Sequence, residues 1–164
     1  MAKKFKAGPF KKWLHHVAGV AIKTRDDFTC QWQASLECLG GMVPGDAGCH
    51  PHHVVSRKYN IVAWDPLNLI CLCSSCHALA DDQSLIFGIW FEAKYPNRAE
   101  HIAKMLLLPS KTWRQADFEQ EEHDILEYCI DMNVDYLSVN LAHRDRYRRR
   151  IKENQCLTQP YGTK

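Results

Sequence analysis

The chain has 164 residues and a mass of 19.0 kDa, which fits one compact domain with a substantial core. Its 46% hydrophobic and 24% charged residues are typical of a globular protein, and its apolar runs are far shorter than the roughly 20 residues that span a bilayer. The net charge of +2 conceals basic stretches near both ends of the chain, around residues 3–12 and 144–152, with an acidic stretch over 117–131. This segregation predicts that the basic ends bind an anionic polymer.

Cysteine usage depends on the compartment. No secretory signal follows the basic N-terminus, so we expect a cytoplasmic protein. In a reducing cytoplasm the eight cysteines are expected to be metal ligands or small buried residues rather than a disulfide framework.

The first half of the chain is expected to be one helix followed by a loop and a hairpin. A proline suited to a first helical turn and apolar residues at helical spacing predict a helix over Pro9–Arg25. From 26 to 66 the chain is rich in turn formers and metal-ligand types, and little regular structure is expected. Two β-type runs, Val54-Val55 and Leu67–Leu72, then predict a small antiparallel hairpin.

The second half is expected to be helical. Ser74 or Ser75 is a candidate cap for a helix that starts near Cys76 and places His77 and Asp81 one turn apart on one face. Further helices are expected over Ser84–Tyr95, from Asn97 with Glu100 in a capping box, over Asp117–Met132 and over Asp135–Lys152. The expected single domain thus has an N-terminal helix (9–25), a core (26–82), a helical extension (84–153) and a loose tail (154–164).

Four cysteines have the spacing of a structural zinc site. Cys73 and Cys76 form a C-x2-C pair, which holds two thiolates in a geometry suited to tetrahedral zinc. Cys30 and Cys38 supply a second pair, although the gap between them exceeds the usual two to four residues, and Cys49 is a further candidate. We therefore predict structural Zn²⁺ at the first four; the alternative is that Cys30 and Cys38 are buried thiols.

Two other cysteines are expected in the core. Cys71 alternates with Cys73 along a β-type run, so its side chain points to the opposite face of the strand. Cys129 lies on an apolar helical face. His15 and His16 sit in a helical pattern, where one packed and one exposed ring is expected rather than a ligand pair.

Three segments, "CHPHHVVSRKYN", "DPLNLICLC" and "SSCHALADD", together resemble the HNH, or ββα-metal, endonucleases. That family pairs a histidine doublet, a central asparagine and a final histidine within a zinc-knuckle frame. The match covers roughly Cys30 to Asp82. The resemblance implies an α+β fold with a zinc-stapled ββα-metal core, flanking helices and a helical C-terminal half. It also implies metal-dependent hydrolysis of DNA phosphodiester bonds.

The resemblance also implies a role for each matching residue. His53 becomes the general base that deprotonates the attacking water, and Asn68 orients its imidazole. His52 and His77 become ligands of a catalytic divalent cation, Mg²⁺ or Mn²⁺, with Asp81 where many relatives place a third ligand, often histidine. Independently of the family, neighbouring residues on a strand project to opposite faces, so one histidine of the doublet can bind metal while the other meets water.

DNA is the expected partner, with no organic cofactor and no membrane. Arg57 and Lys58 are candidate phosphate contacts, although a solvated turn explains them nearly as well. The basic ends are expected to bind the DNA backbone through Lys11, Lys12, Arg144, Arg148 and Arg149, the alternative being a solvated charged helix end. One such site cuts one strand, so a double-strand break would require a homodimer, another partner or two successive events.

A weaker resemblance concerns the C-terminal half. "IWFEAKYPNRAEHIAKM" followed by "KTW" looks similar to the C-terminal part of phage NinG or Rap-like recombination proteins, which makes branched DNA a candidate substrate. The alternative function is a non-catalytic, zinc-containing nucleic-acid-binding accessory in phage recombination or packaging. His50 is expected to be a solvated loop residue, and the role of Cys49 stays open.

Overall fold

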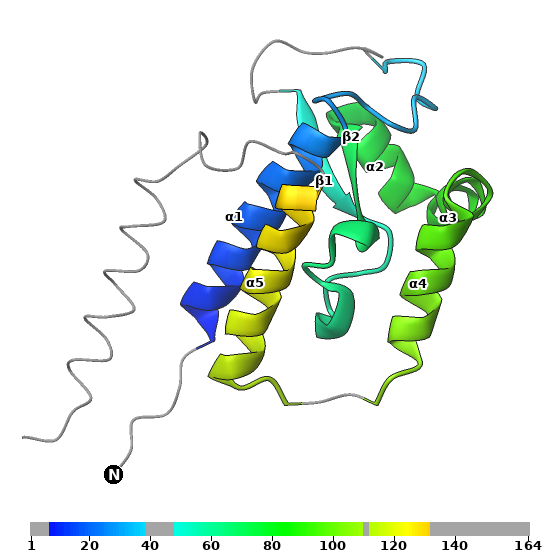
Figure 1. Cartoon of the computed structure of the whole chain (residues 1–164). Helices are drawn as coiled ribbons and strands as arrows, with labels where there is room; N and C mark the ends of the chain where they lie inside the picture. The colour runs from blue at the N-terminus through cyan, green and yellow to red at the C-terminus, as the bar shows by residue number, and fades with distance from the viewer. Residues whose placement is uncertain (1–6, 39–47, 110–111, 132–164) are drawn as a thin grey trace, which may run out of the picture.

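The computed structural model describes residues 7–38, 48–109 and 112–131 of the chain (Figure 1). Within these ranges the fold is α+β, with five α-helices and one two-stranded sheet. The helices α1 and α5 lie side by side on one flank of the sheet, and α2, α3 and α4 lie on the other (Figure 1). The elements are α1 (Gly8–Arg25), β1 (Cys49–His53), the 3-10 turns η1 (Asn60–Val62) and η2 (Pro66–Asn68), β2 (Leu69–Cys73), α2 (Ser74–Asp82), α3 (Ser84–Lys94), α4 (Pro96–Leu106) and α5 (Gln115–Asp131).

The sheet is an antiparallel hairpin in which Cys49 lies opposite Cys73 and His53 opposite Leu69. The second strand confirms the expected β-type run, but the first strand was expected at Val54-Val55 and lies just before it. The side chain of Asn68 bonds the backbone of Val55 beyond the end of β1: it accepts from the Val55 N–H at 2.8 Å and donates to the Val55 C=O at 2.9 Å. The β-propensity of two valines is a weak preference that these bonds override.

Both faces of β2 are buried, so this strand joins two apolar cores. Leu69 and Cys71 face a core that α1 and α5 cover, which confirms the buried position expected for Cys71. Ile70 and Leu72 face a second core beneath α2, α3 and α4. The alternation of side chains along β2 thus places one apolar core on each face of the strand, which sets the layers of the fold.

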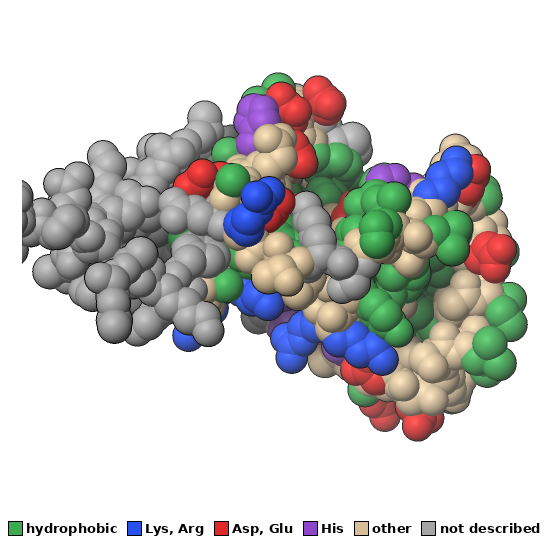
Figure 2. All heavy atoms as spheres, turned by 90° about the horizontal axis from the view of Figure 1, so that it is seen from below, with side chains coloured by type: hydrophobic (Ala, Val, Ile, Leu, Met, Phe, Trp, Pro, Cys, Tyr) green, Lys and Arg blue, Asp and Glu red, His purple; other side chains and the backbone are tan. Residues whose placement is uncertain are grey.

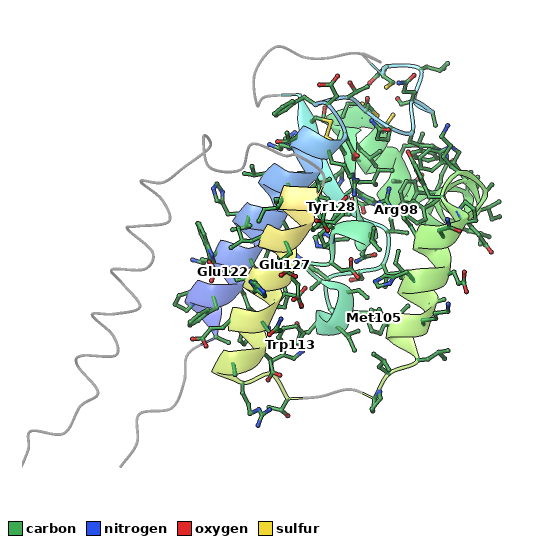
Figure 3. All side chains as sticks on the ribbon, in the orientation of Figure 1. Arg98, Met105, Trp113, Glu122, Glu127 and Tyr128 are labelled. Carbon is green, nitrogen blue, oxygen red and sulfur yellow. A yellow bond between two sulfur atoms is a disulfide. The ribbon has the colours of Figure 1, made fainter. Side chains whose placement is uncertain are left out.

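Helices α1 and α5 run in the same direction along the first core. Near their N-termini Phe10 packs against Phe118, with ring centroids 6.0 Å apart, and Trp13 Nε1 donates to Glu122 Oε1 at 2.9 Å. Figure 3 labels Glu122 on α5. Cys129 is 1% exposed in this core, as expected, and burial raises the pKa of its thiol to about 11.

Two arginines from different helices hold the start of β2. Arg25 at the end of α1 and Arg98 on α4, which Figure 3 labels, both donate to the carbonyl of Leu69, at 2.9 and 2.7 Å. Burial, followed by the nearby charge of Arg25, lowers the pKa of Arg98 to about 10. Asp26 pairs with Arg25 at 2.6 Å and also accepts from the backbone N–H of Cys71 at 2.8 Å. The hairpin is therefore held by polar clamps as well as by its two cores.

Within the described residues the expected helices are present, but two of their caps differ from the prediction. Helix α2 begins at Ser74 with Cys73 as its N-cap, because the Cys73 sulfur accepts from the N–H of Cys76 in place of a serine hydroxyl. Helix α4 begins at Pro96 and has no side-chain cap, so the capping box at Asn97 is wrong. A proline already has the backbone angle of a first helical turn.

Some expectations concern residues outside the described ranges. These are the helix over Asp135–Lys152, the tail over 154–164, and Arg144, Arg148 and Arg149. Among the helices that the structure describes, none is both long and apolar enough to cross a membrane.

Candidate functional site

Four cysteine sulfurs converge beside the hairpin. The sulfurs of Cys30, Cys38, Cys73 and Cys76 all lie within 4.8 Å of one another, and those of Cys38 and Cys73 are 3.6 Å apart. Thiolates bound to one tetrahedral zinc at a Zn–S distance of about 2.3 Å lie about 3.8 Å from each other. The four cysteines can therefore hold a metal ion, and their predicted convergence is confirmed.

The long gap between Cys30 and Cys38 closes through local backbone turns. Gln33 has a positive φ of 51°, and the N–H of Cys38 donates to the carbonyl of Ser35 at 2.9 Å. The N–H of Ser35 in turn donates to the sulfur of Cys76 at 3.4 Å. The loop thus supplies two cysteines and also a donor to the cluster.

Cys73 is prepared to act as a thiolate. Burial alone raises the pKa of its thiol, but hydrogen bonds with the Ser75 hydroxyl at 3.2 Å, the Cys76 N–H at 3.5 Å and the Cys38 sulfur outweigh burial. Together they lower the pKa of the Cys73 thiol to about 6, which favours the thiolate. The thiolate is the form that binds metal ions.

A second cluster joins β1 to α2. The carboxylate of Asp81 lies 3.2 Å from His77 Nδ1, one turn earlier on α2, and 4.0 Å from His52 Nδ1 on β1. One ligand atom from each of the three residues lies within 4.8 Å of the others. The imidazole rings of His52 and His77 meet edge to face, with centroids 4.6 Å apart. The structure therefore brings together the three residues expected at a divalent cation.

His52 has the form that a metal ligand needs. It is 6% exposed, and Phe87 packs against its ring at 4.9 Å. Burial, and then the neighbouring His77, lowers its pKa to about 4, so the ring is neutral at neutral pH. Within the described residues its buried Nδ1 has no hydrogen-bond partner. Leaving such an atom unpaired costs about 1–3 kcal/mol, and a bound cation would remove that cost.

His53 projects from the opposite side of β1. Its Nε2 lies 2.9 Å from the carbonyl of Ala63, and because a carbonyl only accepts, Nε2 carries the ring proton and Nδ1 keeps a lone pair. Burial lowers the pKa of His53; the bond to Ala63 opposes this, and the charges of Arg57 and His77 lower it further. At neutral pH His53 is therefore a neutral base whose orientation is fixed.

Asn68 acts on a loop rather than on the imidazole of His53. It is fully buried, and its Nδ2 donates to the carbonyls of Val55 and Val62, at 2.9 and 2.8 Å. The expected direct contact with His53 is absent from the described residues. Asn68 instead fixes the loop that ends beside Ala63, whose carbonyl orients His53. Any influence of Asn68 on His53 is indirect.

The expected basic residues line the loop after β1 and the start of α1. Arg57, Lys58 and Lys12 are exposed, and Lys58 Nζ lies 5.0 Å from the ring centre of Tyr59. Lys11 Nζ donates to Asn60 Oδ1 at 3.4 Å, which ties α1 to that loop. Seen from below, Figure 2 shows blue Lys or Arg and purple His side chains next to one another on the surface.

Two features of the site were not predicted. His15 on α1 lies edge-on to His53, with centroids 5.8 Å apart, and no local sequence pattern links residues so far apart in the chain. Cys49, left open as a zinc candidate, is instead joined to Cys71 as a disulfide with a Cα–Cα distance of 5.8 Å. For this pair the expectation of no disulfide is wrong, because the hairpin sets the two cysteines on neighbouring strands. His50 is exposed, as expected.

Because comparisons with known proteins gave no match, a function is assigned from the geometry of the site. A scan against protein-family models gave no match, and searches of curated proteins and of solved structures gave no significant match.

Proposed function

We propose that the protein is a metal-dependent endonuclease that hydrolyses DNA phosphodiester bonds through an HNH site. The observation that carries this proposal is the buried, unpaired Nδ1 of His52 beside His77 and Asp81, with His53 next to it in sequence on the other side of β1. The neutral state of His52 and the fixed tautomer of His53 are the states that a metal ligand and a general base require.

The residues divide the reaction between them. His53 Nδ1 accepts a proton from a water molecule as the water oxygen attacks phosphorus, and the bond from phosphorus to the leaving oxygen breaks. His52, His77 and Asp81 would hold the divalent cation, Mg²⁺ or Mn²⁺. When bound there, the cation supplies stabilisation for the added charge on phosphorus and on the leaving oxygen. The exposed Asp81 carboxylate, a hard oxygen ligand, suits these ions.

The four cysteines have a different proposed role, as ligands of structural Zn²⁺ that staples the loop over residues 30–38 to the hairpin and α2. A site with four protein ligands has no open position for substrate. Three of the four cysteines are buried, and Cys73 and Cys76 accept hydrogen bonds from backbone N–H groups. Such surroundings suit a closed, structural site.

A plasmid-nicking assay with added Mg²⁺ or Mn²⁺ tests the proposal. We expect wild type to nick supercoiled DNA and His53→Ala to lose about 10²–10⁴-fold of that rate, the usual contribution of a general base. His123→Ala is the matched control, because His123 is an exposed histidine on α5, paired with Glu127, and should cut like wild type.

Substrate shape and the rival function are decided in the same assay. Linear, nicked, flap and four-way DNA, compared at equal concentration, show whether branched DNA is preferred. If wild type cuts none of these forms with any divalent cation but still binds them, the protein is the non-catalytic nucleic-acid-binding module. If His53→Ala cuts as fast as wild type, the enzyme stands and His53 is not its base.

A further inference from the structure

Helix α1 brings a third histidine to the His53 side of the hairpin, and the proposed hydrolysis gives it no role. The half-buried ring of His15 lies edge-on to His53 at 5.8 Å and to Trp64 at 5.6 Å. Trp64 is 1% exposed and packs against Phe118, which holds this side of the contact in place. Within the described residues neither ring nitrogen of His15 forms a hydrogen bond. His15 therefore has a fixed position and free polar atoms.

Two cationic side chains stand near the same ring. Lys11 lies one helical turn before His15 on α1, and its bond to Asn60 directs it toward the loop after β1. Arg57 lies in that loop, within the stretch that joins His53, which His15 contacts, to Asn60, which Lys11 bonds. Consistent with this placement, the charges of Arg57 and Lys11 lower the pKa of His15, after burial and His53. Arg57 also lowers the pKa of His53. Basic groups from α1 and from the loop thus converge beside the proposed base.

The positive charge of this group is not balanced by acidic side chains. In the described part of the chain neither Lys11, His15 nor Arg57 forms an ion pair. By contrast, the proposed cation site of His52, His77 and Asp81 includes a carboxylate. Ammonium, guanidinium and imidazole N–H groups together offer several donors to one anion. Phosphate, like carboxylate, matches the guanidinium fork, and a lysine complements its charge. For a protein that acts on nucleic acid, the backbone phosphate is the anion at hand.

We propose that Lys11, His15 and Arg57 form a phosphate-binding subsite that holds a backbone phosphate of the nucleic acid beside the one that is cut. The inference rests on the proposed function for the identity of its ligand. The subsite is complete only when α1 and the loop after β1 are both in place, because α1 carries Lys11 and His15 and the loop carries Arg57. It places the phosphate on the α1 side of His53, whereas His77 and Asp81 lie on α2.

The test measures affinity for a short duplex DNA by fluorescence anisotropy, with structural metal retained and no Mg²⁺ or Mn²⁺ added. We expect Lys11→Gln and Arg57→Gln each to weaken binding about tenfold, as for a lost charged hydrogen bond. Each should also reduce the slope of log K against log salt by about one. Lys94→Gln and Lys104→Gln are matched controls, because each removes an exposed lysine charge from α3 or α4, away from α1 and the loop after β1, and both should change affinity less than threefold.

His15 has its own readout. The ring protons of His15 should shift on the addition of duplex DNA, and His15→Asn should weaken DNA binding while the circular dichroism spectrum stays that of wild type. Inorganic phosphate is added in a separate titration. A shift that saturates with inorganic phosphate at concentrations where duplex DNA causes none would overturn the assignment to a nucleic-acid backbone.

The outcomes separate this inference from the proposed function. Equal losses of affinity in the subsite variants and in their two controls would disprove the subsite, even if the protein cuts DNA through His53. Conversely, subsite variants that bind tenfold more weakly support it even if no divalent cation produces cleavage, because binding is measured without turnover.

Discussion

The two ligand clusters share one hairpin and one helix, yet they differ in how open they are. The cysteine cluster is enclosed, with Cys30, Cys73 and Cys76 buried. In the histidine cluster His52 is buried, while the side chains of His77 and Asp81 are 35% and 66% exposed. A closed tetrahedral site stabilises a fold, whereas a three-ligand site facing solvent leaves positions for water and substrate. Exposure and ligand number together therefore separate the proposed staple from the proposed catalytic centre.

Helix α2 produces this difference. Its first turn, with Cys73 as cap and Cys76 just inside, faces the enclosed loop over residues 30–38. His77 and Asp81 follow on a side that meets His52 of β1 and remains open to solvent. The first turn of α2 thus contributes ligands to the buried cysteine cluster, and its next turn contributes ligands to the open histidine cluster.

Loss of a cysteine ligand is expected to have the largest effect. Cys76→Ser should remove the proposed zinc and strongly lower the melting temperature, because binding of structural zinc contributes about 10 kcal/mol or more to the folding of zinc-finger peptides. Zinc content by mass spectrometry and thermal unfolding by circular dichroism measure both effects. Cys129→Ala, a buried cysteine outside the cluster, should lose some stability and keep its zinc. Retention of one zinc by Cys76→Ser would move the metal elsewhere.

Loss of a ligand from the solvent-exposed histidine cluster is expected to reduce activity without affecting folding. His77→Ala should reduce the proposed Mg²⁺- or Mn²⁺-dependent cleavage about hundredfold while zinc content and melting temperature stay close to wild type, since His77 is partly exposed. Cleavage rate against Mn²⁺ concentration, with melting curves alongside, measures the separation. Loss of zinc in this variant would mean that the two clusters are not independent.

The smallest expected effect is a pH dependence of stability from His52. Its pKa is about 4 in the folded chain and near 6.5 when unfolded, so between these values the unfolded chain binds the extra proton. Stability from this group is therefore lost as pH falls below 6.5, by about 2 kcal/mol between pH 7 and pH 5. Urea unfolding at both pH values, without added divalent cations, should show that drop reduced in His52→Gln. An unchanged difference would mean that His52 is not buried as a neutral ring.

Much of the fold could be predicted from local patterns. Apolar spacing predicted α1, the β-type run predicted β2, and the alternation of Cys71 with Cys73 placed them on opposite faces. The position of β1 could not be predicted, because the bonds between Asn68 and Val55 join segments on the two sides of a loop. Propensity carries no information about such bonds.

Some features of the candidate site could likewise be predicted from local sequence, and others could not. Its cysteine pairs and its His77–Asp81 pair were visible because both partners of each pair lie within a turn or a short loop. The partners of Asn68 and the capping role of Cys73 were not visible, since each depends on which donor lies nearest after folding. Cys49 was likewise ambiguous until the hairpin placed it beside Cys71.

The ligand types, their spacing and the two faces of the hairpin could be read from local sequence, because they depend on neighbouring residues and on the geometry of one strand and one helix. The enclosure of the cysteine cluster and the openness of the histidine cluster depend on tertiary packing, since solvent exposure is set by the residues that pack above each cluster. Only the tertiary structure brought His15 to His53, because α1 and β1 meet when a shared apolar core forms between them.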